Sequence, residues 1–140
     1  MEKFFLGIVK VLMFLWQLPQ NIVGLVMYIF LKNKKVVDET TWCKCWVADN
    51  MQGGISLGSF AFVSPGLSKH PESVAHELRG HTVDSRIFGP LYLIVVGIPS
   101  ILNAALDFTK CYYDWYPEKW ANEHAGLETD EYCRLKFKNE

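Results

Sequence analysis

The stretch SVAHELRGHTVDS, residues 73–85, contains the two histidines and the glutamate of a zinc-peptidase helix, with one residue too many. Such a helix normally has the pattern H-E-x-x-H, so that both imidazoles point toward one metal ion. Here His76, Glu77 and His81 form H-E-x-x-x-H. On a regular α-helix, residues five apart lie about 140° from each other around the axis, and the two rings diverge. A shared metal site therefore depends on the local geometry of this helix.

Two geometries are compatible with the extra residue. A single π-bulge, at about 4.4 residues per turn, returns His76 and His81 to one face, and such bulges concentrate at functional sites. Gly80, which has a low helix propensity, is a suitable place for the irregularity. If the helix stays regular instead, Glu77 and His81 share a face, with Asp84 or Ser85 one turn further on. That face is either a carboxylate–imidazole metal site or a surface ion pair without a function.

The composition limits the classes of function. A chain of 140 residues is one domain, or one small domain with a membrane anchor. Half of its residues are hydrophobic and 14% are aromatic, which is rich for a soluble protein of this size. A formal net charge of -1 provides no basic face, so we expect no nucleic-acid partner. The aromatic cluster in residues 112–120 is typical of a membrane interface, with substrate stacking as the alternative.

The cysteines leave the redox compartment open. Cys43 and Cys45 form a C-x-C pair, and in a strand their side chains would project from the same face. This spacing favours small buried side chains in a strand. A zinc site built from all four cysteines, or a disulfide pair, is the alternative.

Residues 11–31 contain no charged side chain and are long enough to cross the roughly 30 Å core of a bilayer. The segment LPQN, residues 18–21, predicts a break, so that two short helices form a hairpin in place of one straight span. A cleaved signal peptide is not expected, because the first alanine is Ala48 and no A-x-A site is available. We therefore expect residues 1–35 to be a retained anchor in contact with membrane lipid, and residues 36–140 to form one domain.

A second uncharged stretch covers residues 87–106. Gly97 and Pro99 predict a kink or a chain reversal in its middle. If this stretch crossed the membrane once, His81 and the segment WYPEKW would lie on opposite faces, roughly 30 Å apart, and would not share a metal. We expect an arrangement that does not span the membrane.

Local patterns predict the remaining elements. Residues 41–63 contain two groups of β-formers around the turn-rich NMQGGISLGS, which predicts a small hairpin. Pro71 suits the first turn of a helix that runs through the histidines to about Arg86. A further helix is expected to start near Pro117, and the charged tail from Glu128 is expected to fray.

Several segments together point to a known family. They are, in chain order, GGISLGSF, HELRGHTVDSR, FGPLYLIVVGIPS and WYPEKWAN. This series resembles a family of small bacterial membrane-associated zinc metallopeptidases of the minimal gluzincin type, with HEYGH-x-x-Q-S-R, GPLYL-x-V-x-G-x-PS and WPEKWAD. The similarity covers residues 51–122, and LWQLPQNIVGL is similar to the family's anchor. The resemblance implies an α+β fold with an N-terminal hydrophobic helix or hairpin, a β-hairpin, a metal-site helix, a kinked hydrophobic segment and a C-terminal helix.

Carried over residue by residue, the resemblance implies a zinc site. His76, His81 and Glu118 would be the Zn²⁺ ligands, and Glu77 would be the general base that takes a proton from the attacking water. NMQGGISLGSF would provide an edge strand for an extended peptide. Residues 36–140 would then be a minimal metallopeptidase-like domain, a hydrolase of peptide or protein substrates at the bacterial inner membrane.

Two departures from the family pattern leave other functions open. One is the inserted residue in H-E-L-R-G-H, and the other is Asn122 in place of an aspartate that would orient a ligand histidine. A relative that lost its chemistry would serve as a membrane-bound interaction or scaffold protein, with or without a bound metal. A further alternative is metal binding through Glu77, His81 and Glu118 without hydrolysis.

Overall fold

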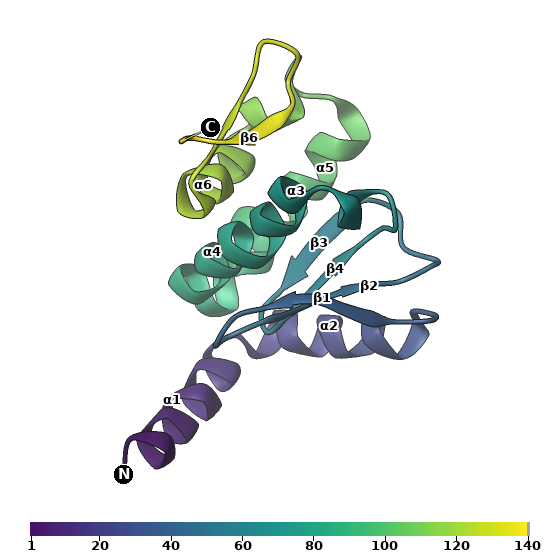
Figure 1. The fold of residues 1–140 in the computed structure, drawn as a ribbon. Helices are drawn as coiled ribbons and strands as arrows, with labels where there is room; N and C mark the ends of the chain where they lie inside the picture. Colours follow the sequence, from purple (N-terminus) through teal and green to yellow (C-terminus); the bar gives the residue numbers. More distant parts are fainter. Residues whose placement is uncertain (140) are drawn as a thin grey trace.

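The computed structural model describes residues 1–139 and has an α+β fold (Figure 1). The α+β class is thereby confirmed. The α-helices are α1 (Glu2–Trp16), α2 (Leu18–Phe30), α3 (Pro71–Ala75), α4 (Thr82–Phe88), α5 (Ile98–Leu106) and α6 (Tyr116–Ala125). The strands are β1 (Lys35–Glu39), β2 (Lys44–Val47), β3 (Gly54–Leu57), β4 (Phe60–Val63), β5 (Leu127–Thr129) and β6 (Leu135–Phe137). His76–His81 and Leu93–Gly97 are π-helical, and short 3₁₀ turns occur at Leu67–Lys69, Gly89–Leu91 and Tyr112–Asp114.

A four-stranded sheet with the order β1-β2-β4-β3 lies at the centre of the fold. β2 runs parallel to β4, whereas β1 and β3 are antiparallel to their neighbours. The prediction of a single hairpin over residues 41–63 is therefore wrong. Residues expected to form its turn instead form the edge strand β3, and the tight turn is Gly58–Ser59, where Gly58 has a φ of 67°. The glycines of this short edge strand resemble turn chemistry in the sequence, which explains the error.

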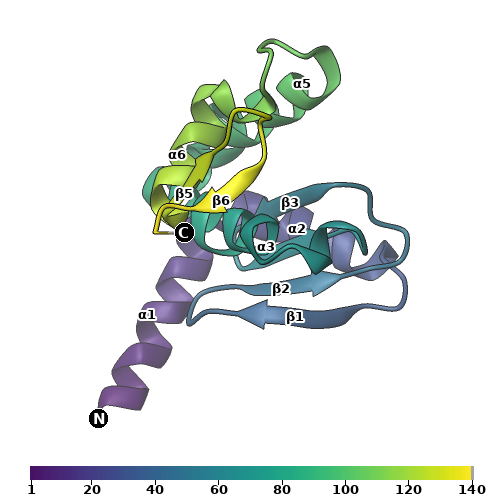
Figure 2. The same cartoon turned by 45° about the horizontal axis from the view of Figure 1, so that its top comes forward.

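Helices cover both faces of the sheet (Figures 1 and 2). α2 lies against one face, where Gly24 leaves no room for a Cβ beside Phe60. The helix that contains the histidines covers the other face, in a buried cluster formed by Cys43, Cys45, Ala61, Val63, Val74 and Leu78. Both thiols of the C-x-C pair are free and buried, as expected for small side chains of a strand.

The N-terminal helices break at Gln17, as LPQN predicts, but they meet at 89° and do not form a hairpin. Within residues 1–139, no single helix is both long and apolar enough to cross a bilayer, although this bent pair passes that test by length and composition. α1 has no buried residue. α2 has an inverted pattern, because its buried residues are Gln20, Asn21 and Gly24 while most of its large apolar side chains are exposed.

The second uncharged stretch does not reverse direction. Leu93–Gly97 leads directly into α5, with Pro99 in the first turn of that helix, so the irregularity predicted here is a π segment. Proline has no N–H to donate to the Val95 carbonyl four residues earlier. The Tyr116 hydroxyl donates to that carbonyl instead, at 2.6 Å.

The C-terminal region is more ordered than its charge suggests. α6 has Pro117 in its first turn, as predicted. The prediction of a frayed tail from Glu128 is wrong, since β5 and β6 form an antiparallel hairpin. A disulfide between Cys111 and Cys133 joins this hairpin to the loop that precedes α6. The charged residues of the tail lie on an exposed hairpin that this cross-link ties to the rest of the chain.

Candidate metal centre

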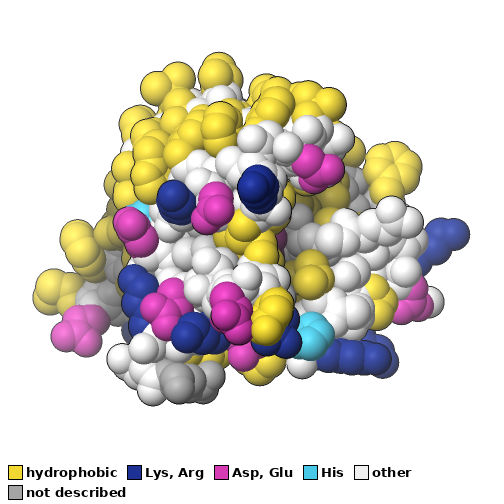
Figure 3. Space-filling model, turned by 90° about the horizontal axis from the view of Figure 1, so that it is seen from above, with side chains coloured by type: hydrophobic (Ala, Val, Ile, Leu, Met, Phe, Trp, Pro, Cys, Tyr) yellow, Lys and Arg dark blue, Asp and Glu magenta, His cyan; other side chains and the backbone are white. Residues whose placement is uncertain are grey.

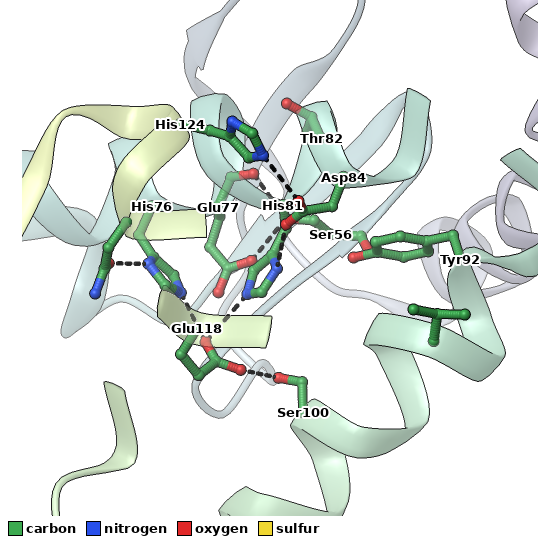
Figure 4. Close-up of polar contacts among 12 residues, drawn as sticks. Ser56, His76, Glu77, His81, Thr82, Asp84, Tyr92, Ser100, Glu118 and His124 are labelled. Carbon is green, nitrogen blue, oxygen red and sulfur yellow. Dashed lines mark hydrogen bonds and ion pairs between the residues drawn. The ribbon is translucent and has the colours of Figure 1, made fainter. Parts of the chain in front are cut away.

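The π segment His76–His81 places both histidines on one face of the helix (Figure 4). Their ring centroids are 4.8 Å apart, and the ring planes are 84° from each other. Both side chains are buried. The π-bulge is therefore confirmed as the way in which the chain absorbs its extra residue. The regular helix, with Glu77 in place of the first histidine, is not adopted.

Two neighbouring residues support the widened turn. Thr82 Oγ1 donates a hydrogen bond of 2.5 Å to the Leu78 carbonyl, so this backbone acceptor has a partner. A Cβ on Gly80 would lie 2.5 Å from the Ala121 carbonyl oxygen of α6. The absence of a side chain at Gly80 thus permits α6 to approach, and α6 carries Glu118.

Glu118 completes a cluster with the two histidines. Its Oε2 lies 2.9 Å from His76 Nε2 and 3.1 Å from His81 Nε2. The ligand atoms of the three buried residues all lie within 4.8 Å of one another. Donors about 2.1 Å from a tetrahedral ion stand roughly 3.4 Å apart, so only small adjustments are needed. These three residues can hold one metal ion.

The second nitrogen of each imidazole faces an oxygen of a neighbouring side chain, through a hydrogen bond at His76 and at a longer, ion-pair distance at His81. His76 Nδ1 donates to Asn122 Oδ1 at 2.8 Å, and His81 Nδ1 faces Asp84 Oδ2 at 3.6 Å. Both contacts fix the direction of the rings and leave each Nε2 toward the shared centre. Asn122 therefore provides an oxygen acceptor although it is not a carboxylate.

Asp84 is a site residue that the sequence reasoning placed near His81 only in the regular-helix alternative, where Asp84 or Ser85 lies one turn further on. In the bulged helix Asp84 also lies one turn after His81 and faces it. Its carboxylate is 1% exposed and also faces His124 Nε2 at 3.1 Å. The spacing of three residues between His81 and Asp84 on a helix is the signal for this contact.

The charges in the cluster stabilise one another. Burial alone would raise the pKa of Glu118, but the two histidines lower it well below its ordinary value. Burial alone would lower the pKa of His81, but the Asp84 and Glu118 carboxylates raise it to about 10. The metal-free site therefore favours an ionised Glu118 and a protonated His81, and a metal ion would take the place of that proton.

Glu77 lies beside this cluster without being part of it. Its carboxylate accepts a hydrogen bond from Ser56 Oγ in β3 at 2.6 Å. Gly54, on the same strand, lies so close that a Cβ there would collide with Glu77 Oε1. Both β3 residues thus hold the carboxylate at the edge of the sheet, facing the cavity that His81 also lines.

Two residues of the aromatic cluster lie against the site. The ring of Tyr113 packs edge-on against His76, with centroids 5.3 Å apart. The Tyr112 hydroxyl lies 3.0 Å from Ser100 Oγ, and Ser100 donates to Glu118 Oε1. Ser100 thus holds one oxygen of Glu118 while the other oxygen faces the histidines.

A cavity of about 300 Å³ adjoins the cluster. It lies between β3 on one side and α5 with the Leu93–Gly97 segment on the other, and Glu77, His81 and Ser100 line its polar end. A ligand in this cavity would contact both Glu77 and His81.

Comparison of this chain with protein-family models, with curated proteins and with solved structures finds no match.

Proposed function

We propose that this protein is a membrane-associated, zinc-dependent peptidase. The observation that carries the proposal is the buried cluster of His76, His81 and Glu118, with Glu77 held beside it. The resemblance to minimal gluzincin peptidases assigns the same three ligands and the same base. The pattern of residues and their geometry thus support one chemistry.

Zinc is the metal that this donor set suits best. Two imidazoles and one carboxylate are typical of catalytic zinc, with the fourth position open to water. Zinc bound there would supply an acidified water, with a pKa of about 7, and would polarise the carbonyl of the substrate. Asn122 and Asp84 would keep the ligand rings aligned.

Glu77 is the proposed general base. Its carboxylate would accept the proton of the attacking water and pass it to the leaving amine. Ser56 fixes one carboxylate oxygen by a hydrogen bond. The other oxygen packs closely against the backbone of Gly54, which is possible because Gly54 has no side chain. The proposed base therefore has little freedom to turn away from the cavity.

The edge strand β3 supports the binding of an extended peptide. Leu57 and Phe60 flank a two-residue turn and pair with each other, so Gly54 and Ser56 take the alternate positions, whose main-chain groups point away from β4. The Ser56 carbonyl accepts a hydrogen bond of 2.9 Å from Tyr92, which holds the strand in place. The outward main-chain groups of the exposed Gly54 are placed to pair with a substrate main chain, next to the buried Ser56.

The N-terminal helices support membrane association. α1 exposes apolar side chains on all sides, and α2 buries polar residues while it exposes large apolar ones. In water this arrangement would leave an extended apolar surface unprotected. Contact with lipid would cover it, as expected for an anchor in the bacterial inner membrane.

The test of the proposal is the metal content of the full chain. Protein purified in detergent without nickel resin, and then repleted with zinc, is measured by inductively coupled plasma mass spectrometry. We expect about one zinc per chain, lost in His76→Ala, His81→Ala and Glu118→Ala. The exposed His70 provides the matched control, and His70→Ala should keep the metal.

The variant Glu77→Gln separates a catalyst from a metal-binding protein. We expect it to keep zinc and to lose hydrolysis of an unfolded protein substrate, followed by mass spectrometry. Loss of zinc would make Glu77 a ligand and overturn the peptidase assignment. Absence of zinc from the unmodified protein would favour the interaction or scaffold alternative.

A further inference from the structure

The cavity beside the site is mostly apolar, and its polar lining consists of Glu77, His81, two serines and two tyrosines. Its other walls come from apolar residues of α2, β3, the Leu93–Gly97 segment and α5, which include Val23, Ile55, Leu57, Leu93, Ile98 and Ile101. Cavities of this size and character usually bind ligands with a large apolar part and a few polar contacts. The occupant that fits these walls is an apolar side chain.

The mouth of the cavity is apolar on the outside as well. Val23, Ile98 and Ile101 line the cavity, yet they are 41%, 52% and 55% exposed. Ile94 and Leu102, on the same helical stretch, are also exposed. Figure 3 shows hydrophobic side chains gathered along one edge of the molecule, while charged side chains occupy the area below it. The route into the site therefore crosses an apolar surface.

The inverted pattern of α2 indicates that this apolar surface is suited to contact with lipid. Gln20 and Asn21 face the protein, whereas Ile22 and Val26 point outward beside the mouth residue Val23. A helix that hides its polar side and presents its apolar side is suited to lipid, because lipid carries no penalty for apolar contact. The mouth thus continues the surface on which a bilayer would lie.

We propose that the substrate is an apolar segment of a membrane protein, which reaches the site from the bilayer and extends along β3. One large apolar side chain of that segment enters the cavity next to Glu77. The inference rests on the proposed function and specifies its substrate class. A polar segment that arrives from water would have to pass over the exposed isoleucines at the mouth. An apolar segment in the bilayer already lies at the depth of these isoleucines.

A pair of neighbouring alanines in α5 provides the first test. Ala104 lines the cavity, and Ala105 is exposed and does not line it. The full chain, in phosphatidylcholine nanodiscs, is photo-cross-linked to two extended peptides that differ only by leucine or aspartate at the central position. We expect the leucine peptide to bind about tenfold more tightly, given the transfer free energy of a buried leucine. Ala104→Phe should remove this preference, and Ala105→Phe should keep it.

These results separate the inference from the proposed function, because cross-linking requires no hydrolysis. Equal binding of both peptides, or equal effects of the two phenylalanine variants, would overturn the inference even if zinc and hydrolysis are found. A leucine preference sensitive only to Ala104→Phe would support it even if the metal test failed.

The position of the mouth is tested separately with a spin label. Ile101→Cys and Lys44→Cys are labelled in phosphatidylcholine vesicles, since Cys43 and Cys45 are buried and the other two cysteines are disulfide-bonded. We expect dissolved oxygen to relax the label at Ile101 and a water-soluble nickel chelate to relax the label at Lys44. Relaxation of both labels by the chelate would rule out delivery from the bilayer.

Discussion

The two π segments of this protein have similar backbones and very different surroundings. His76–His81 is polar, largely buried and packed against α6. Leu93–Gly97 is apolar and partly exposed, and it forms a wall of the cavity. Both lead to Glu118, because the histidines face one of its carboxylate oxygens and Ser100, just beyond the second segment, holds the other. The comparison teaches that a π-turn has no chemistry of its own and only decides which side chains share a face.

The largest effect is expected from making the His76–His81 segment one residue shorter or longer. Deletion of the exposed Arg79 restores H-E-x-x-H, so we expect zinc affinity within about tenfold of the unmodified protein. Insertion of alanine after Arg79 turns the histidines apart, and we expect a loss of more than about 100-fold. Affinity is measured by competition with a chelating dye, and circular dichroism checks the fold.

The matched control is an alanine inserted after Ile94, in the second segment. It leaves the histidine spacing intact and disturbs the support that Ser100 gives to Glu118, together with the Tyr116–Val95 hydrogen bond and the cavity wall. We expect a loss of about tenfold in zinc affinity. Equal losses from the two insertions would show that the first segment has no special role.

Each π segment contains one glycine, and the addition of a single methyl group at each glycine tests how tightly the two segments are packed. A Cβ on Gly80 would meet the Ala121 carbonyl oxygen at 2.5 Å, whereas a Cβ on Gly97 would meet Leu93 at an ordinary 3.5 Å. We expect Gly80→Ala to destabilise the protein by about 1–3 kcal/mol, and Gly97→Ala to stabilise it by up to about 1 kcal/mol. Urea unfolding measures both, and destabilisation by Gly97→Ala alone would contradict the packing described here.

Alkaline titration should distinguish the segments, because only the first contains ionisable side chains. The pKa of His81 is raised to about 10. It therefore stabilises the folded, metal-free protein below the ordinary histidine pKa of about 6.5, and this contribution is lost as the pH rises through 10. With a chelator present, we expect the free energy of unfolding to fall between about pH 7 and pH 10. His81→Gln should flatten this slope and Val95→Ala should keep it; the reverse result would refute the assignment.

The smallest expected effect concerns the backbone of the second segment. Tyr116→Phe removes the hydroxyl that donates to the Val95 carbonyl. We expect a loss of about 1 kcal/mol in the free energy of unfolding, because this acceptor has no N–H at Pro99 to replace it. Zinc affinity should stay unchanged, and a decrease in it would mean that the two segments are coupled more tightly than their contacts suggest.

Local features of the fold could be predicted from the sequence. The break near Gln17, the helix start at Pro71 and the helix near Pro117 depend on prolines and uncharged runs, which act over a few residues. The parallel pairing of β2 with β4 could not be predicted, because these strands are not consecutive in the chain and β3, which lies between them in sequence, takes the edge of the sheet. The hairpin formed by the tail was also not predicted. It is cross-linked by a disulfide, and the partner of Cys133 lies 22 residues away in the sequence, so no local pattern indicates it.

The site was predictable to a similar extent. The H-E-x-x-x-H spacing left two geometries open, of which the π-bulge is the one adopted, and the resemblance assigned His76 and His81 as ligands. Glu118 came from the resemblance alone, because the packing of α6 against Gly80 brings it to His81. The contacts of Ser56 and Ser100 carry no local signal, since they depend on neighbours that are far away along the chain.

The buried side of α2 is polar, which is the reverse of the usual pattern of a helix that packs on a protein. Gln20 Nε2 donates to Ser85 Oγ at 3.0 Å and to the Gly89 carbonyl at 2.9 Å, and Ser85 donates to Gln17 at 2.7 Å. A hydropathy scale would rank Gln20→Leu as an improvement of the helix, yet that change would remove both hydrogen bonds of the Gln20 amide and leave Ser85 and the Gly89 carbonyl without this donor. A design programme that scores only hydropathy would therefore remove the two glutamines whose hydrogen bonds join the N-terminal helices to α4.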